Sequence, residues 1–216
     1  MSTVDLMRLV TEKTPVRSER EHLRLLVDSR PEIPDRPAGI FGTGPSPAPM
    51  MRESARLLEQ WGAEILAIPC NTAHAFLDEV REAVSIEVLD MLGLVGRELA
   101  SRFDPGTPVG LLATTAAAKA RIFHHRIPGF NLVTPSDEVH EELVAPAILQ
   151  VKLEDSVAEP RGKLLEAVQT LHPPPKAVIA GCTEVELALA GAETRVPVFL
   201  PMDLLAQEIV DRAWRS

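Results

Sequence analysis

The stretch AVIAGCTEVEL (residues 177–187) contains the order of elements that decides the fold. A short apolar, β-prone run leads into a cysteine, and the residues after the cysteine are able to begin a helix. The stretch ILAIPCNTAH (residues 65–74) repeats this order around Cys70. The chain has two cysteines, so both of its thiols lie where a strand is predicted to end and a helix to begin.

Outward from these two stretches, short apolar runs alternate with helical-period segments along almost the whole chain. This alternation predicts an α/β fold built on mainly parallel sheets. The predicted strands are 23–28, 64–69, 86–91, 108–114, 130–135, 176–181 and 196–201. The predicted helices are 3–13, 50–61, 72–84, 92–103, 116–125, 136–150, 156–171, 183–190 and 202–214. Pro146 falls inside one helical pattern, so we expect a kink or a break there.

The composition is that of a folded protein with an acidic balance. Hydrophobic residues make up 45% of the chain, charged residues 25%, and the net charge is −9. Nucleic acids and anionic membranes need a basic footprint, so we expect neither as a partner. No apolar stretch approaches the roughly 18–20 residues of a membrane span, and the first residues lack the apolar core of a signal peptide. We therefore predict a cytoplasmic protein with reduced thiols.

The position of the two cysteines suggests reactive thiols. A helix N-terminus presents unpaired N–H groups and a partial positive charge, which favour thiolate over thiol. The alternative is structural, because free cysteine often fills buried space at the end of a strand. Neither cysteine has the spacing of a metal site, so no metal is predicted. His74, one helical turn after Cys70, is predicted to pack or cap locally.

The segment 30–49 is rich in proline and glycine and follows the predicted strand 23–28. It is either a stiff surface loop or a ligand loop of the kind that open α/β sheets present. Its GTGPSP sequence does not match a phosphate-binding GxxxxGK[ST] loop, so we predict no nucleotide site.

Together, PCNTAHAF and AGCTEVEL resemble the paired cysteine signatures of the aspartate racemase branch of the cofactor-independent Asp/Glu racemase superfamily. TVDLMRLVTEKTP, PEIPDR, LLATT and PMDLLA follow the same family order. Glutamate racemases usually carry His after the second Cys-Thr, and this chain carries Glu184, which favours the aspartate type. The resemblance implies two pseudo-symmetric α/β lobes with a cleft between them, and homodimers are common among the proteins it resembles. We place the first lobe at residues 1–104 plus the C-terminal helix 202–216 and the second at 105–201, with the boundary in RFDPGTPVG (102–110).

The same resemblance implies a reaction without a cofactor, in which Cys70 and Cys182 alternate as thiolate base and thiol acid on opposite faces of Cα. It assigns Arg36 and Lys152 as the cations around an acidic amino-acid substrate. The further substrate-binding residues that it implies are Asn71, Thr72, Thr114, Thr115 and Thr183.

Three departures from the resembling family stand out. Its members typically begin with a strand and a glycine-rich turn ahead of the helix matching 3–13, and we expect the true start to lie upstream. Alanines occupy 116–117, where Gly-Thr is frequent, and Leu200 stands where an acidic residue is common. These two changes leave the exact substrate open.

Two alternatives to an aspartate racemase remain. One is another reaction of the superfamily, with glutamate, a hydantoin or maleate as substrate. The other is a relative that binds a small carboxylate, or only a partner chain, without catalysis.

Overall fold

The computed structural model describes residues 2–153 and 157–214. By their contacts, these residues form two compact units, which are described separately below. Unit 1 comprises residues 1–91 and 202–216, and unit 2 comprises residues 92–201. The contacts therefore group the helix α5 (Met91–Arg102), apart from its first residue, with unit 2, whereas the sequence placed this helix in the first lobe.

Unit 1 contains a small parallel sheet of two strands, β1 (Ile65–Leu66) and β2 (Glu87–Val88), in which Leu66 is opposite Val88. Apolar residues of α3 (Ala48–Gln60) and α4 (Leu77–Arg81) pack on this sheet and share one core with it. The 3-10 helix η2 (Thr72–Phe76) contributes Phe76 to the same core. Two shorter helices complete this part of the unit, η1 (Glu19–Glu21) and α2 (Arg36–Phe41). The segment 30–49, predicted as a loop, thus contains a short helix.

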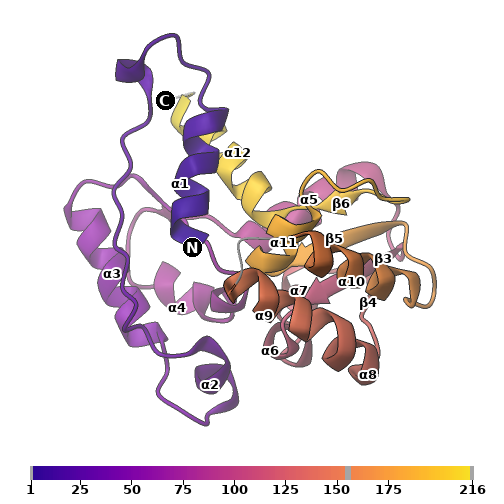
Figure 1. Ribbon diagram of the computed structural model, residues 1–216. Helices are drawn as coiled ribbons and strands as arrows, with labels where there is room; N and C mark the ends of the chain where they lie inside the picture. The colour runs from indigo at the N-terminus through magenta and orange to yellow at the C-terminus, as the bar shows by residue number, and fades with distance from the viewer. Residues whose placement is uncertain (1, 154–156, 215–216) are drawn as a thin grey trace. The chain divides into compact units, whose positions relative to one another are not determined.

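The helix α1 (Ser2–Lys13) packs beside α12 (Pro201–Trp214) through Val10, Ala206 and Val210. Lys13 also forms an ion pair with Asp203 at 2.8 Å. Figure 1 shows these two helices, at opposite ends of the chain, side by side. The strand predicted over 23–28 is wrong, because these residues form no ladder with any described strand. Leu23 and Leu25 instead pack against the α1–α12 cluster. The two leucines are therefore partly buried by packing on helices and not by forming a sheet.

Unit 2 is built on a four-stranded parallel sheet in the order β4-β3-β5-β6. Its strands are β3 (Pro108–Ala113), β4 (Asn131–Val133), β5 (Ala177–Gly181) and β6 (Val198–Phe199). The two central strands, β3 and β5, are almost continuously buried, as expected for a parallel sheet covered on both faces. The register pairs Ala113 with Gly181, so β3 and β5 end together at their carboxyl ends.

Helices α9 (Ala145–Leu153), α10 (Ala158–Gln169) and α11 (Thr183–Leu189) share a core with Leu112, Val178 and Ala180 of the sheet. Because neighbouring residues of a strand point to opposite faces, Leu111 and Ile179 belong to the other face. Figure 1 shows α9, α10 and α11 in orange and yellow tones beside β5. Arg161 of α10 donates to the carbonyls of Ala188 (2.7 Å) and Ala190 (3.1 Å), which holds the C-terminal end of α11.

Two predicted helices of unit 2 are interrupted. The pattern over 116–125 forms α6 (Thr115–Lys119) and α7 (Ile122–Arg126), separated at Arg121, whose φ of 52° is left-handed. The pattern over 136–150 begins as α8 (Asp137–Val139) and widens into the π-helical segment η3 (His140–Val144) just before Pro146. Proline has no N–H to donate into the preceding turn, and the π-helical turn ends directly before α9, which contains Pro146 and continues beyond it. A kink or a break at Pro146 itself stays a prediction.

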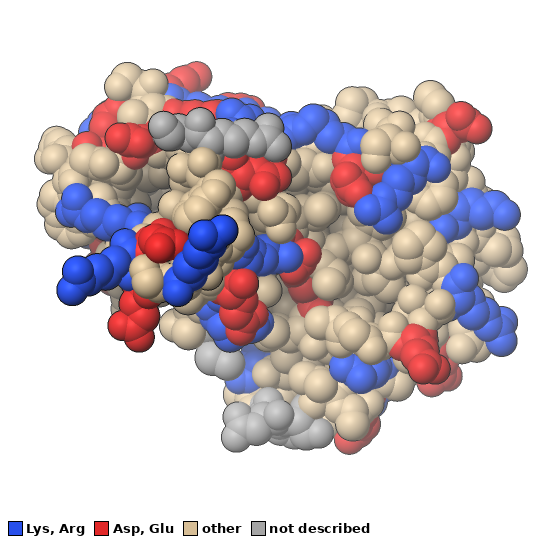
Figure 2. All heavy atoms as spheres, turned by 90° about the horizontal axis from the view of Figure 1, so that it is seen from above, with Lys and Arg blue, Asp and Glu red and all other residues tan. Residues whose placement is uncertain are grey.

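The strands and helices therefore confirm an α/β fold with parallel sheets flanked by helices. None of the helices in the described ranges combines the length and the apolar character needed to cross a membrane. On the face drawn in Figure 2, Lys and Arg side chains are interspersed with Asp and Glu side chains.

Candidate active site

In unit 1, Cys70 lies four residues beyond the end of β1, directly ahead of Asn71 and η2. Its N–H donates to the carbonyl of Ile68 at 2.8 Å, which tightens the chain at this point. The sequence predicted a single helix over 72–84, but η2 comes first and α4 follows it. Cys70 is half-buried and its thiol is free.

His74 holds the backbone around Cys70. The His74 ring is fully buried, and its Nδ1 lies 2.9 Å from the carbonyl of Cys70. Its Nε2 accepts the N–H of Met91 at 3.1 Å. A carbonyl can only accept and an N–H can only donate, so the ring is neutral with its proton on Nδ1. His74 therefore packs locally, as predicted, and is not the base that would deprotonate Cys70.

Asn71 is the most informative neighbour of Cys70. It is only 3% exposed, and neither its Oδ1 nor its Nδ2 has a hydrogen-bond partner within residues 2–153 and 157–214. A buried polar group without a partner costs about 1–3 kcal/mol. Such a cost at the residue beside a candidate catalytic thiol marks the amide as a candidate ligand contact. The adjacent Thr72 is also buried, at 8% exposure.

Arg36 lies at the start of α2, a helix that packs against η2 within unit 1. The preceding residue, Asp35, caps α2 by accepting the N–H of Ala38 at 3.1 Å. One nitrogen of the Arg36 guanidinium makes two long contacts of 3.4 Å, to the carbonyls of Ile33 and Pro34. Unit 1 thus brings together Cys70, Asn71 and Thr72, and it holds Arg36 on the helix packed beside them.

In unit 2, Cys182 follows β5 directly and is the N-cap residue of α11. Because β3 and β5 end together, Thr114 occupies the same edge of the sheet on the neighbouring strand. The Thr114 hydroxyl accepts the N–H of Ala117 at 3.2 Å and caps α6, and Thr115 after it is exposed. Ligand sites of open α/β sheets lie at this carboxyl edge.

The Cys182 thiol is engaged by a carboxylate. Cys182 is 6% exposed, and its Sγ donates to Oε2 of Glu184 at 2.8 Å. The hydroxyl of Thr183 donates to the same oxygen at 2.9 Å. Nζ of Lys152, on α9, lies 3.9 Å from Oε1 of Glu184. Three of the predicted site residues, Lys152, Cys182 and Thr183, therefore converge on Glu184.

This environment favours the protonated form of Cys182. Burial raises the pKa of the thiol, and the charge of Glu184 and the hydrogen bond to it raise this pKa further. The more distant Lys152 lowers the pKa by a smaller amount. The backbone N–H of Glu184, at the start of α11, also lowers the pKa, as expected at a helix N-terminus, but the net shift at Cys182 is upward. The helix α11 has only seven residues, and burial and an adjacent carboxylate outweigh its dipole.

Sequence reasoning used Glu184 only to choose between branches of a superfamily and missed its contact with the thiol. The available signal was an acidic residue two positions after a cysteine at a strand end. His140 was missed as well: its Nε2 donates to the carbonyl of Ala113 at 3.0 Å, where β3 ends beside Thr114. The π-helical turn that carries His140 is an irregularity of a kind frequently found at functional sites.

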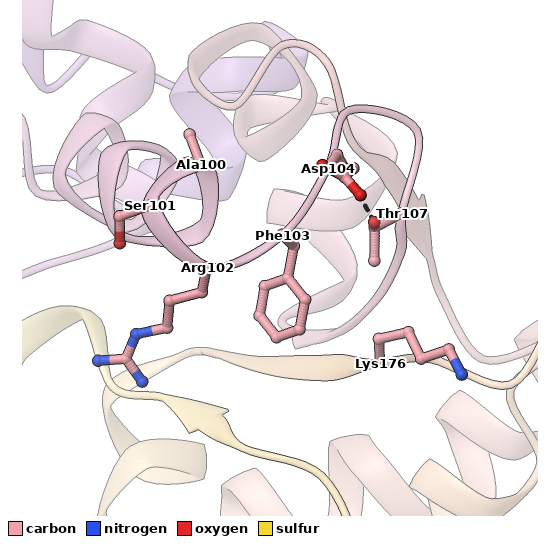
Figure 3. Close-up of a pocket in the computed structure, with 7 residues that line it drawn as sticks. All are labelled: Ala100, Ser101, Arg102, Phe103, Asp104, Thr107 and Lys176. Carbon is pink, nitrogen blue, oxygen red and sulfur yellow. Dashed lines mark hydrogen bonds between the residues drawn. The ribbon is translucent and has the colours of Figure 1, made fainter.

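A cavity of about 450 Å³ lies elsewhere in unit 2. Figure 3 shows Arg102, Lys176 and Thr107 among the side chains around it. Thr107 and Lys176 immediately precede β3 and β5, so this cavity is at the opposite edge of the sheet from Cys182. Two of its polar side chains have local partners: Thr107 donates to the carbonyl of Asp104, and Arg102 pairs with Glu98. We assign it no chemistry.

No group of three or more His, Cys, Asp or Glu side chains suited to a metal ion occurs among the described residues. A thiol can donate a proton, and a thiolate can accept one. Each unit presents one thiol after the carboxyl end of a parallel strand, with polar donors beside it.

Comparisons with known proteins point to one family. The sequence model of the family described as Asp/Glu/Hydantoin racemase matches residues 1–209. The chain is 20% identical over 158 residues to the broad specificity amino-acid racemase RacX of Bacillus subtilis, a match that covers 73% of this chain and 68% of the relative.

Two solved structures have the same fold. An aspartate racemase from Picrophilus torridus superposes with a TM-score of 0.83 at 25% identity, over 99% of this chain and 89% of that one. An aspartate racemase homologue from Pyrococcus horikoshii superposes with a TM-score of 0.79 at 22% identity, over 99% of this chain and 94% of the other.

Proposed function

The chain belongs to the Asp/Glu/Hydantoin racemase family, and from this premise we propose that it interconverts the L- and D-enantiomers of aspartate by proton transfer between Cα and two thiols. The observation that carries the proposal is the matched setting of Cys70 and Cys182. Both are free thiols that follow parallel strands, and the two units supply one each.

The proposed reaction uses one thiol as base and the other as acid. A thiolate removes the proton from Cα, and the electron pair of the broken C–H bond moves toward the α-carboxylate. A thiol on the other face then donates its proton to Cα, which inverts the stereocentre. Because burial and Glu184 favour the thiol form of Cys182, we assign Cys182 as the proton donor in one direction, with Cys70 as the base. The reverse direction exchanges these roles, and no step is assigned to pyridoxal phosphate or another cofactor.

The neighbours of the thiols suit a dicarboxylate substrate. Negative charge that develops on the α-carboxylate needs preorganised donors, and the buried amide of Asn71 is one such group. Arg36 and Lys152 supply positive charge in a protein whose net charge is −9. We further propose that Thr72, Thr114, Thr115 and Thr183 contribute hydroxyl or backbone donors.

Aspartate is proposed first because the similar structure at 25% identity is described as an aspartate racemase. RacX is described as a broad specificity racemase, so glutamate and other amino acids belong in the same assay.

Chiral chromatography of both enantiomers, together with deuterium uptake at Cα in heavy water, tests the reaction. We expect inversion by the unaltered protein and loss of inversion in Cys70→Ser and in Cys182→Ser. Full racemisation by either variant would contradict the two-thiol scheme. Ligand binding without deuterium uptake from either enantiomer would indicate a carboxylate-binding protein instead. Hydroxylamine, which traps the aldehyde of pyridoxal phosphate, is expected to leave the activity unchanged.

The role of Lys152 has a matched control in the same unit. Lys152→Met is expected to raise KM for aspartate by about ten-fold or more, since one charge-assisted contact contributes about 1.5–3 kcal/mol. Lys176→Met removes the same charge at the opposite edge of the sheet and is expected to leave KM unchanged. Equal effects of the two substitutions would contradict a substrate contact for Lys152.

Homodimer formation is also proposed, from family membership alone. Light scattering of the eluted protein during gel filtration measures it directly.

A further inference from the structure

A thiol and a carboxylate of α11 form the closest ionisable contact of the candidate site. Sγ of Cys182 lies 2.8 Å from Oε2 of Glu184, whose side chain is only 13% exposed. Oε2 also accepts from Thr183, and Lys152 lies 3.9 Å from the other oxygen. The carboxylate is thus fixed by two neighbours in addition to the thiol, and its position does not depend on the thiol alone.

Racemisation places two opposite demands on Cys182. In one direction it must hold a proton to donate, and in the other it must begin as a thiolate. The structure satisfies the first demand, because the thiol is buried and faces a carboxylate. A thiolate beside an ionised Glu184 would bring two negative charges together in a poorly solvated place. The second demand therefore requires an acceptor for the thiol proton.

We propose that Glu184 is the proton partner of Cys182, and this inference rests on the proposed function. While Cys182 acts as the acid, the Glu184 carboxylate accepts the hydrogen bond of the thiol. When Cys182 must act as the base, the proton moves from Sγ to Oε2. The S–H bond breaks, an O–H bond forms, and the negative charge passes from the carboxylate to sulfur. Glu184 does not contact the substrate in this scheme, and it acts only through Cys182.

Other charged groups around Cys182 do not offer this transfer. Lys152 of α9 is cationic and cannot accept a proton. Arg161 of α10 binds the carbonyls at the far end of α11. Glu184 is the carboxylate that contacts the thiol, at 2.8 Å, and is therefore placed to accept its proton.

The thiol can be titrated directly in this chain. The Cys70→Ser variant keeps Cys182 as its one thiol, and the sequence contains no tyrosine whose ionisation would obscure thiolate absorbance in the ultraviolet. In this background, Glu184→Gln removes the carboxylate charge but keeps an oxygen that can accept the S–H bond. We expect the thiolate of Cys182 to appear about one pH unit lower, or more, than with Glu184 in place.

Turnover separates a proton partner from a charged neighbour. In the protein with both cysteines, we expect Glu184→Gln to lower kcat/KM by about 10²-fold, although it makes the thiolate easier to form. Glu184→Asp keeps an acid and should recover part of the loss. The equilibrium constant of racemisation is unity, so kcat/KM must fall equally for both enantiomers, and any directional effect appears in the separate kcat values. Glu138→Gln removes one exposed charge from α8 and is the matched control, with both readouts unchanged.

Two results would overturn the inference. Titration curves that superpose with and without Glu184 would show that it does not govern Cys182. If Glu184→Gln shifted the thiolate titration but left kcat/KM unchanged, Glu184 would affect the pKa of Cys182 without taking part in proton transfer. Absence of racemisation in the unaltered protein would instead contradict the proposed function, and the titration would still decide the coupling between Cys182 and Glu184. Circular dichroism of each variant verifies folding.

Discussion

Replacing His74 with leucine tests whether this histidine holds the backbone around Cys70. The ring spans two segments of unit 1, because Nδ1–H donates to the carbonyl of Cys70 at 2.9 Å and Nε2 accepts from the N–H of Met91 at 3.1 Å. Leucine has a similar volume and no polar atoms. The substitution therefore removes both hydrogen bonds while leaving the packing volume nearly unchanged.

The expected loss follows from the burial of the two backbone groups. Met91 is fully buried, so its orphaned N–H costs about 1–3 kcal/mol. Cys70 is half-buried, so its carbonyl contributes about 1 kcal/mol, the low end of that range. The total, about 2–4 kcal/mol, is a large share of the roughly 5–15 kcal/mol that stabilises an ordinary domain.

Urea unfolding followed by tryptophan fluorescence measures this loss in the correct part of the molecule. Trp61 and Trp214 both belong to unit 1, as does His74. His74→Asn can replace the Nδ1 donor, and His74→Gln can replace the Nε2 acceptor. Each of these variants should therefore lose about half of the unfolding free energy that His74→Leu loses. Leu77→Met, a volume-conserving change in the same core, should cost less than about 1.5 kcal/mol.

A loss below about 1 kcal/mol in His74→Leu would refute the reasoning, because the bonds would then contribute no more than one exposed hydrogen bond. So would full stability in both His74→Asn and His74→Gln. Either result would mean that the ring does not hold the two segments together.

Three further predictions concern unit 2. A Cβ at Gly181 would meet three side-chain atoms at 2.7–3.0 Å, whereas one at Gly162 meets none within 4 Å. Gly181→Ala should therefore lower the free energy of unfolding by about 1–3 kcal/mol. Gly162→Ala, in an exposed turn of α10, should raise it by about 0.5–1 kcal/mol, and thermal unfolding measures both changes. Arg161→Ala removes both bonds to the end of α11 and should lower stability by about 1–3 kcal/mol in urea. Burial raises the pKa of Cys182 in the folded state, so its contribution to stability is complete below the unfolded pKa of about 8.5. Above that pH the contribution declines by up to about 1.4 kcal/mol per pH unit. Cys182→Ser should therefore reduce the loss of unfolding free energy between about pH 8 and pH 10.

The sequence predicted the central part of the fold well, for a physical reason. Strands β3 and β5 are buried on both faces, so their sequences are continuous apolar runs, and their predicted limits agree with the structure to within a residue. The run 23–28 failed because alternating leucines suit a helix pair as well as a sheet. Only the neighbours that a segment meets in the fold distinguish these two uses.

The sequence predicted where the two thiols lie in the fold, but it did not predict the charged and buried polar groups beside them. Cysteines at strand ends identified the thiols, and a family resemblance added Lys152 and Thr183. The contact of Glu184 with Cys182 was missed because it depends on the extended N-cap conformation of Cys182, which sequence spacing does not specify. The unsatisfied amide of Asn71 was missed for a similar reason, since burial is a property of the folded chain.

The two thiols share a sequence frame but differ in what holds them, and this difference bears on the proposed mechanism. At Cys70 the histidine of the same motif binds the backbone carbonyl and is fixed as a neutral ring. At Cys182 the glutamate of the motif binds the sulfur itself. A two-base racemase needs one thiol and one thiolate at the start of each turnover, and two identical environments would favour equal protonation of both. Among residues 2–153 and 157–214, a carboxylate contacts the sulfur of Cys182 and favours its thiol form, so the unequal neighbours supply an asymmetry that the matched motifs lack.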